Sequence, residues 1–360
     1  MLKQSTSALW DRYDLAMLDL DGVVYVGPHA VPGAPDALTK AAAAGLHLAY
    51  VTNNAARPPG VVAAHLRDLG IDARDEDVVT SAQAAARLLS EHVPRGSRVF
   101  VIGGPGLFEA LEETDLRPVQ SVEEDPVAVV SGYWSDLPWG TVSAGAILVA
   151  RGLFWVASNA DVSVPTPLGP GPGNGVLVGA VASFTGREPV VAGKPQATLF
   201  QETRRRVGGE RPLVVGDRLD TDIEGAHNAG WDSLLVMTGV TGVEDLVSAP
   251  AGLRPTYVSA GLDGLGSAHP LPEREAGPDG FPAWRLRGWR VGGPPGSLAV
   301  DGEGGIDDWW RVVAVAGWHH LDAGDRVDVA GLTPPREREH AVGPWDGAER
   351  RPLPEDGETP

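Results

Sequence analysis

The sequence contains no cysteine, only three lysines and no long apolar run. Without cysteine the protein can form neither disulfide bonds nor thiolate metal sites, which fits a cytoplasmic protein without requiring one. A membrane-spanning helix needs about 18 consecutive apolar residues, and no such stretch occurs. The first residues also lack the apolar segment of a secretion signal. We therefore expect a cytoplasmic protein that has no membrane partner.

Positive charge is also scarce, since 29 lysines and arginines face 48 acidic residues and the net charge is −19 at pH 7. A chain this acidic repels the phosphate backbone, so nucleic acid is not an expected partner. A small anionic substrate is not excluded, because one local cation and a few hydrogen-bond donors can outweigh the average field.

The first three quarters of the chain alternate short apolar strands with helical segments. This alternation predicts an α/β fold, in which a parallel sheet carries helices on both faces. The expected strands are 15–18, 46–51, 99–102, 128–131, 154–157, 212–215 and 233–237, and the expected helices include 34–44, 60–69, 82–90, 143–152, 176–185 and 198–207.

After about residue 270 the composition changes. This part contains six of the eleven tryptophans, many glycines and prolines and no lysine. It predicts a small separate module over 270–333, with β-like pieces such as 309–315 and with His319 and His320 at the surface. The charged, proline-rich segment 334–360 is expected to be disordered.

Two aspartates, Asp19 and Asp21, follow the buried strand 15–18 directly, and Gly22 comes next. In an extended segment alternate side chains share a side, so both carboxylates point the same way. Ligands of α/β sheets bind at the carboxyl ends of strands. Two carboxylates there favour a bound cation such as Mg²⁺. The alternative is an ordinary turn, because Asp-Gly is common after strands.

Further polar residues follow other expected strands or precede a helix. They are Thr52 at the end of the second strand, Lys194 before the helix 198–207, and Asp217 and Asp222 after the strand 212–215. Carboxylates that hold Mg²⁺, together with a lysine and a hydroxyl that hold phosphate oxygens, suit phosphoryl transfer. An aspartate can attack phosphorus directly, and a second carboxyl can protonate the leaving oxygen.

The ordered motifs DLDGVVYVG, TNN, GKP and GDRLDTDI resemble the haloacid dehalogenase superfamily of aspartate-dependent phosphatases. The segment between Asn54 and Lys194 is similar to the class IIA cap of the NagD-like and p-nitrophenyl phosphatase branch, with SNAD at 158–161 and PGNG at 172–175. The resemblance covers about residues 13–262. Each motif alone is weak, but four in this order are a strong signal.

The resemblance implies a role for each matched residue. Asp19 would be the nucleophile, and Asp21 would be the acid and base, with its backbone carbonyl on Mg²⁺. Asp19 and Asp217 would bind the metal through their carboxylates, and Asp222 would act through water or by orienting Lys194. Asp220 occupies a slot that is usually not catalytic. The residues implied in phosphate binding are Thr52, Asn53, Asn54 and Lys194.

The resemblance also implies a Rossmann-like core made of residues 1–80 and 190–266, with an inserted α/β cap at 81–189. Many members of the branch have an aspartate two residues after a glycine of the cap, where this chain has Trp134. Trp134 and Asp136 are therefore candidates for substrate specificity. Packing in the cap core or a homodimer contact through the cap explains the cap tryptophans equally well.

The expected function is a Mg²⁺-dependent phosphomonoester hydrolase that forms an aspartyl-phosphate and acts on a small phosphorylated metabolite. Glycerol 3-phosphate is the first candidate, because members of the branch with a C-terminal appendage resemble phosphatases of that substrate. Phosphoglycolate, pyridoxal phosphate and nucleoside monophosphates remain alternatives. A second class of function is a binding or regulatory protein with an inactive core, and the intact motifs argue against it.

Overall fold

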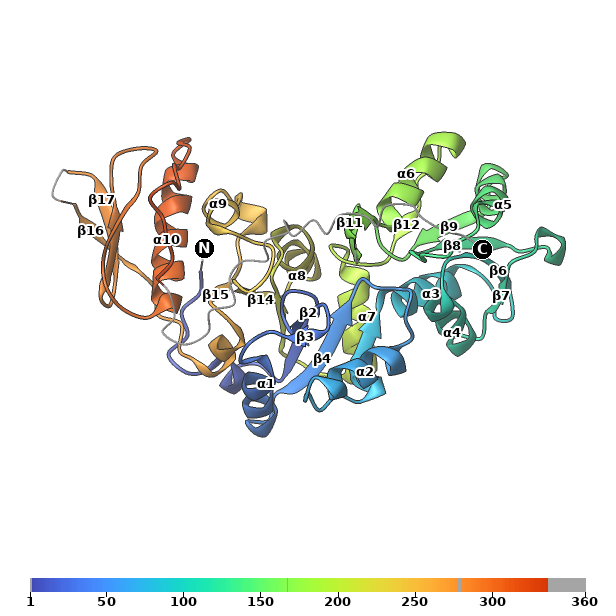
Figure 1. Cartoon of the computed structure of the whole chain (residues 1–360), viewed down its shortest axis with the longest axis horizontal. Coiled ribbons are helices and arrows are strands. Elements are labelled where there is room, and N and C mark those ends of the chain that lie inside the picture. The colour runs from blue at the N-terminus through green and yellow to red at the C-terminus, as the bar shows by residue number, and fades with distance from the viewer. Residues whose placement is uncertain (1, 167, 278–279, 336–360) are drawn as a thin grey trace, which may run out of the picture.

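The computed structural model describes residues 2–166, 168–277 and 280–335. Its three larger sheets follow one another along the long axis of the molecule (Figure 1). Residues 336–360, which include most of the segment expected to be disordered, lie outside the described residues. The parallel α/β architecture with an additional C-terminal sheet confirms the expected fold class.

The central sheet has six parallel strands in the order β15-β14-β13-β1-β4-β5. Alternate residues of the middle strands pack into separate apolar clusters, one on each face. Helices α1 and α2 contribute to one cluster, and α3, α7 and α8 contribute to the other. The strands are β1 (Leu15–Leu18), β4 (His47–Thr52), β5 (Val78–Thr80), β13 (Pro212–Gly216), β14 (Asp232–Val236) and β15 (Tyr257–Ser259). The helices around them are α1 (Ala34–Ala43), α2 (Pro59–Asp68), α7 (Ala197–Val207), α8 (Glu224–Ala229) and α9 (Val243–Val247).

A second parallel sheet, in the order β12-β9-β8-β6-β7, lies beyond the carboxyl end of the central one (Figure 1). Its strands are β6 (Arg98–Ile102), β7 (Arg117–Val119), β8 (Ala128–Ser131), β9 (Phe154–Ala157) and β12 (Val190–Val191). Its helices are α3 (Ser81–His92), α4 (Pro105–Glu113), α5 (Trp139–Ala150) and α6 (Asn174–Thr185). Because β12 pairs with β9, we propose that this inserted unit, hereafter the cap, ends at residue 191 rather than at 189.

Two short hairpins add to these sheets, one in the central domain and one in the cap. A hairpin of β2 (Tyr25–Val26) and β3 (His29–Ala30) follows the first motif, and a hairpin of β10 (Ser163–Thr166) and β11 (Gly169–Pro172) precedes α6.

The C-terminal module is an antiparallel sheet of β16 (Glu273–Ala276), β17 (Pro282–Leu286), β18 (Trp289–Gly292) and β19 (Ala299–Gly302), followed by helix α10 (Ile306–Asp322). The expectation of β structure at 309–315 is therefore wrong. Helix α10 lies between this sheet and the central domain, with contacts to β17 and β18 on one side and to α9 and β15 on the other. A short apolar run cannot be assigned to a helix or a buried strand from its pattern alone, so 309–315 is easily mistaken for a strand. His320 is also buried, with 3% of its surface exposed, rather than at the surface as expected.

Candidate active site

Three motif residues meet because their strands are neighbours in the central sheet. β1 lies between β13 and β4, and Leu18 is in register with Val215 on one side and Tyr50 on the other. The residues that follow, Asp19 after β1 and Asp217 after β13, therefore leave the sheet at the same edge, beside Thr52 at the end of β4. This is the edge of a parallel sheet at which ligands bind.

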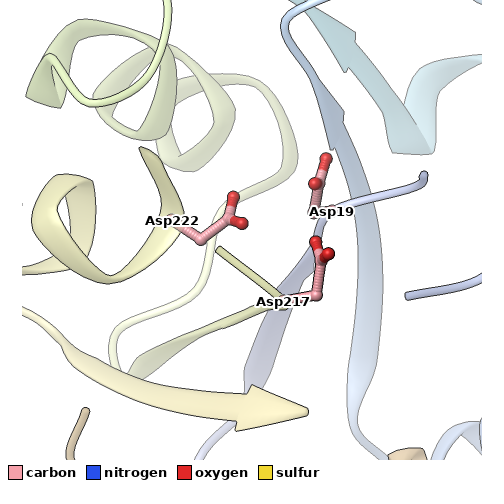
Figure 2. Close-up of side chains that lie close together, drawn as sticks. All are labelled: Asp19, Asp217 and Asp222. Carbon is pink, nitrogen blue, oxygen red and sulfur yellow. The ribbon is translucent and has the colours of Figure 1, made fainter. Parts of the chain in front are cut away.

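Three carboxylates gather at this edge, and Figure 2 shows them approaching one another from separate segments. Asp19, Asp217 and Asp222 each offer one oxygen, and these oxygens lie within 4.8 Å of one another. Asp222 is carried by η4 (Leu219–Ile223), a single turn of π-helix, and both it and Asp217 are fully buried. Like charges at this separation repel strongly, so the cluster requires positive charge.

Lys194 supplies one positive charge from the loop between β12 and α7. Its Nζ lies 2.6 Å from Oδ1 of Asp19 and 2.7 Å from Oδ1 of Asp222. The lysine side chain is only 3% exposed. Burial lowers the pKa of Lys194, but the charges of Asp19 and Asp222 outweigh that effect and raise the pKa above its ordinary value. Lys194 is therefore a fixed cation at the site.

One cation does not balance the carboxylates. Burial first, and then the charges of Asp19 and Asp222, raise the pKa of Asp217 to about 8. Burial and the charge of Asp19 also raise the pKa of Asp222, to about 6, against the lowering effect of Lys194. The protein alone thus disfavours full ionisation of this cluster.

A divalent cation fits these residues. Oδ2 of Asp217 accepts a hydrogen bond of 2.7 Å from the N–H of Val240, whereas its buried Oδ1 has no partner among the described residues. Oxygen ligands of this kind suit Mg²⁺. The loops around the carboxylate pack closely. Gly22 has a φ of +85°, and a Cβ there would lie 2.6 Å from Asp217 Oδ2.

Asp21 keeps access to solvent beside the buried cluster. Desolvation by the surrounding protein, followed by the charge of Asp19, raises the pKa of Asp21 to about 6, and Lys194 and Arg57 oppose the shift. A carboxyl group with such a pKa exchanges protons readily near neutral pH, as general acid–base catalysis requires.

The TNN motif after β4 has two distinct parts. The buried Thr52 accepts a hydrogen bond of 3.0 Å from the N–H of Asn54, and the Asn54 side chain in turn accepts one of 2.9 Å from the N–H of Ala56. The Asn53 side chain instead contacts Lys194, because its Oδ1 accepts a hydrogen bond of 2.8 Å from the backbone N–H of Lys194. Asn53 thus contacts the Lys194 loop through its side chain.

The remaining predicted residues lie apart from the carboxylate cluster. Asp220 pairs with Arg218 at 2.8 Å and is exposed, as its non-catalytic slot suggests. Trp134 and Asp136 line an open cavity of about 580 Å³ on the cap, where the indole ring covers Gly104. None of the residues that line this cavity belongs to the carboxylate cluster.

Sequence reasoning missed two neighbours of the site. Asp161 of the cap reaches the side chain of Asn53 at 3.1 Å. The charge of Arg57 lowers the pKa of Asp21 and so opposes the effect of burial. The SNAD motif contains Asp161, but nothing in its spacing indicates a contact with the TNN motif.

Residues 16–117 match the model of the haloacid dehalogenase-like hydrolases, and residues 191–265 match a second model of HAD-hydrolase-like proteins. Together with the similarities below, these matches show that the chain belongs to the haloacid dehalogenase-like hydrolases, which confirms the resemblance found in the motifs.

Among its relatives, the D-glycerol 3-phosphate phosphatase of Mycobacterium tuberculosis is 40% identical over 297 residues, which cover 82% of this chain and 81% of that protein. An acid sugar phosphatase of Staphylococcus aureus is 36% identical, over 68% of this chain and 94% of its own length.

Solved structures agree with these similarities. The glycerol phosphate phosphatase of M. tuberculosis in complex with magnesium has a TM-score of 0.78 at 38% identity and covers 87% of this chain and 93% of that one. A 4-nitrophenylphosphatase from Thermotoga maritima has a TM-score of 0.66 at 32% identity, with coverages of 72% and 98%.

Proposed function

We propose that this protein is a Mg²⁺-dependent phosphomonoesterase that hydrolyses glycerol 3-phosphate to glycerol and inorganic phosphate. The observation that carries the proposal is the pairing of Lys194 with Asp19 beside an oxygen of Asp217 that has no partner in the described part of the chain. The similarity to phosphatases of glycerol phosphate supports the choice of substrate.

Asp19 acts as the nucleophile in this proposal. Its carboxylate oxygen forms a bond to phosphorus while the bond from phosphorus to the substrate oxygen breaks. Asp21 donates a proton to the departing oxygen and then accepts one from the water that hydrolyses the aspartyl-phosphate, which regenerates Asp19. Lys194 and the Thr52 hydroxyl hold the phosphoryl oxygens through both steps.

The metal would be held by the carboxylates of Asp19 and Asp217 and by the backbone carbonyl of Asp21, while Asp222 keeps Lys194 in place. When bound, Mg²⁺ supplies the positive charge that the transferring phosphoryl group requires. The raised pKa values of Asp217 and Asp222 agree with a site that needs this charge.

The cap carries exposed apolar side chains that support a homodimer. Trp139 and Ile147 of α5 are 75% and 44% exposed, and Val176 and Phe184 of α6 are 48% and 68% exposed. Apolar surface of this kind marks interaction sites. We propose that a second copy covers these two neighbouring helices, and that the Phe184→Asp variant elutes as a monomer in size-exclusion chromatography with light scattering.

No helix in the described ranges is long and apolar enough to cross a membrane. This finding and the small phosphorylated substrate support a cytoplasmic location, which fractionation of the source cells can test.

The function is tested by phosphate release from glycerol 3-phosphate, phosphoglycolate, pyridoxal phosphate and a nucleoside monophosphate with Mg²⁺ present. The highest kcat/KM is expected for glycerol 3-phosphate. The Asp19→Asn variant, which keeps the shape but lacks the attacking charge, should lose at least about a thousandfold in kcat. Asp220→Asn is the matched control and should retain wild-type turnover. Equal rates for Asp19→Asn and wild-type protein would overturn the mechanism.

A further inference from the structure

Asp161 is a charged residue of the cap that contacts the TNN motif of the central domain. The Nδ2 atom of Asn53 lies 3.1 Å from Oδ1 and 3.2 Å from Oδ2 of Asp161. Asp161 itself is tied to the cap, because its N–H donates to Asn159 Oδ1 and its carbonyl accepts from the N–H of Gly175. The contact therefore joins two structural units.

The Asn53 amide carries this contact onward to Lys194. Nδ2 also donates to the carbonyl of Lys194 at 3.1 Å, and Oδ1 accepts from the N–H of Lys194 at 2.8 Å. An amide nitrogen has two hydrogens, so one serves Lys194 and the other the two oxygens of Asp161. Asn53 thus forms hydrogen bonds to both the N–H and the carbonyl of Lys194.

Asp161 reinforces the direction in which the Asn53 amide faces. With the amide reversed, its oxygen would face the Asp161 carboxylate and the Lys194 carbonyl, and its N–H₂ group would face the N–H of Lys194. All of these contacts would be repulsive, so the carboxylate adds to the preference of the Lys194 backbone for the orientation that holds Lys194. Two further bonds fix the backbone of Asn53, whose carbonyl accepts from Ser81 Oγ at 2.6 Å and from Asn159 Nδ2 at 2.7 Å.

We propose that Asp161 is a positioning residue through which the docked cap aligns Lys194. The path runs from the Asp161 carboxylate through the Asn53 amide to the backbone of Lys194, and so to the ammonium group between Asp19 and Asp222. If the cap moves away, Asn53 loses its hydrogen bond to the Asp161 carboxylate, and the hydrogen bonds from Asn53 that position the backbone of Lys194 become weaker. The active site is therefore complete only while the cap is docked. The inference rests on the function proposed above.

A simple tether between cap and core would explain the contact without any effect on Lys194, so the test must separate the two. The Asp161→Ala variant removes the carboxylate, Asp161→Glu displaces it by one methylene, and Asp161→Asn keeps an acceptor oxygen. Steady-state kinetics with glycerol 3-phosphate and Mg²⁺, together with thermal unfolding, give kcat, KM and Tm for each. Glu124→Gln, an exposed cap residue before β8, is the matched control.

We expect kcat to fall about 10- to 100-fold for Asp161→Ala and Asp161→Glu, as for a misplaced catalytic group, with KM within about threefold of wild type. Asp161→Asn should recover most of the rate, because its side-chain oxygen can still accept from Asn53. Glu124→Gln should match the wild type.

A double-mutant cycle with Asn53→Ala identifies the path. If Asp161 acts through Asn53, the Asp161→Ala change costs nothing further in kcat once Asn53 is alanine. Independent, multiplicative losses would overturn the inference, as would a lower Tm with unchanged kcat in both Asp161→Ala and Asp161→Glu. A wild-type protein that releases no phosphate from any phosphomonoester contradicts the proposed function itself. An active wild type with unaffected Asp161 variants contradicts only the inference.

Discussion

The ammonium nitrogen of Lys194 lies 2.6 Å from a carboxylate oxygen of Asp19, although the residues stand on either side of the cap insertion. The same nitrogen lies 2.7 Å from Asp222. The lysine thus balances charge within the fold and, in the proposed mechanism, on the substrate, and both roles can be tested separately.

Replacing Lys194 by methionine should affect both stability and turnover. The variant leaves the buried Asp222 without its cation, and breaking a buried ion pair in this way costs about 3–5 kcal/mol. Chemical denaturation should show this loss, and kcat should fall at least about a hundredfold. Because Mg²⁺ relieves the same repulsion, the stability deficit should shrink when Mg²⁺ is added. A deficit that is independent of Mg²⁺ would argue against a metal beside Lys194.

Removal of the metal should abolish activity and lower Tm. A cation that binds only the native state stabilises it by about 2.7 kcal/mol at a hundred times its Kd. Differential scanning fluorimetry with and without Mg²⁺ measures the shift, and the Asp217→Asn variant should show a smaller one. Ca²⁺ should raise Tm without supporting turnover, since its looser coordination misplaces the attacking carboxylate. Full activity in excess chelator after dialysis would refute the metal requirement.

Trp134 should influence the choice of substrate rather than the chemistry. Its ring covers Gly104 and lines the cavity of the cap, away from the carboxylate cluster. We expect Trp134→Ala to change the ratio of kcat/KM between glycerol 3-phosphate and p-nitrophenyl phosphate by about tenfold. Trp134→Phe, which keeps an aromatic ring, is the control. An equal loss on both substrates would assign Trp134 to packing alone.

His269 should make the protein less stable in mild acid. Burial, followed by the charge of Arg311, lowers the pKa of His269 from 6.5 to about 4, while the Gly264 carbonyl and Asp307 act in the opposite direction. Below pH 6.5 the His269 side chain binds a proton in the unfolded chain, whereas in the native protein it does so only near pH 4. The free energy of unfolding therefore decreases as the pH falls from 6.5 to 4. The maximum loss is about 3 kcal/mol.

Urea unfolding of the wild type and of His269→Gln at several pH values measures this contribution. The variant should lose less stability between pH 6.5 and 4 than the wild type, and the same substitution at the exposed His29 serves as the matched comparison. Parallel curves for the wild type and His269→Gln would contradict the prediction.

The C-terminal module should stabilise the central domain rather than act in the chemistry. Trp318 donates a hydrogen bond of 2.7 Å to the carbonyl of Leu246, and Arg254 pairs with Asp322 at 2.6 Å. A chain that ends at residue 270 exposes the apolar face formed by α9 and β15, so we expect a lower Tm and binding of a hydrophobic dye. Trp318→Phe keeps an aromatic ring but removes part of the buried indole and its hydrogen bond, and should cost about 1–3 kcal/mol. An unchanged Tm in the truncated protein would show that the module is independent.

The sequence predicted most of the central sheet because each strand there is short, apolar and bounded by clear turn residues. It failed at 309–315, where tryptophans and valines in a continuous run resemble a strand. Only the packing of α10 between two surfaces explains why nearly all of these residues are buried although they form a helix. The start of α5 was also missed, since Trp139 precedes the predicted start at residue 143.

The residues of the candidate site could be predicted from local motifs. Asp19, Asp21, Thr52, Lys194 and Asp217 all stand in such motifs. Parallel strands bring whatever follows their carboxyl ends to one edge of the sheet, so the residues after β1, β4 and β13 are expected to lie together there.

The connections between these residues could not be predicted from the motifs and are seen only in the folded protein. The bond from Asp161 to Asn53 joins the cap to the central domain, and no local pattern encodes a contact between segments so far apart along the chain. The hydrogen bond between the Asn53 side chain and the backbone of Lys194 also joins segments that are far apart along the chain. Hydrogen bonds depend on distance and direction in space, and these are fixed only when the cap packs against the sheet.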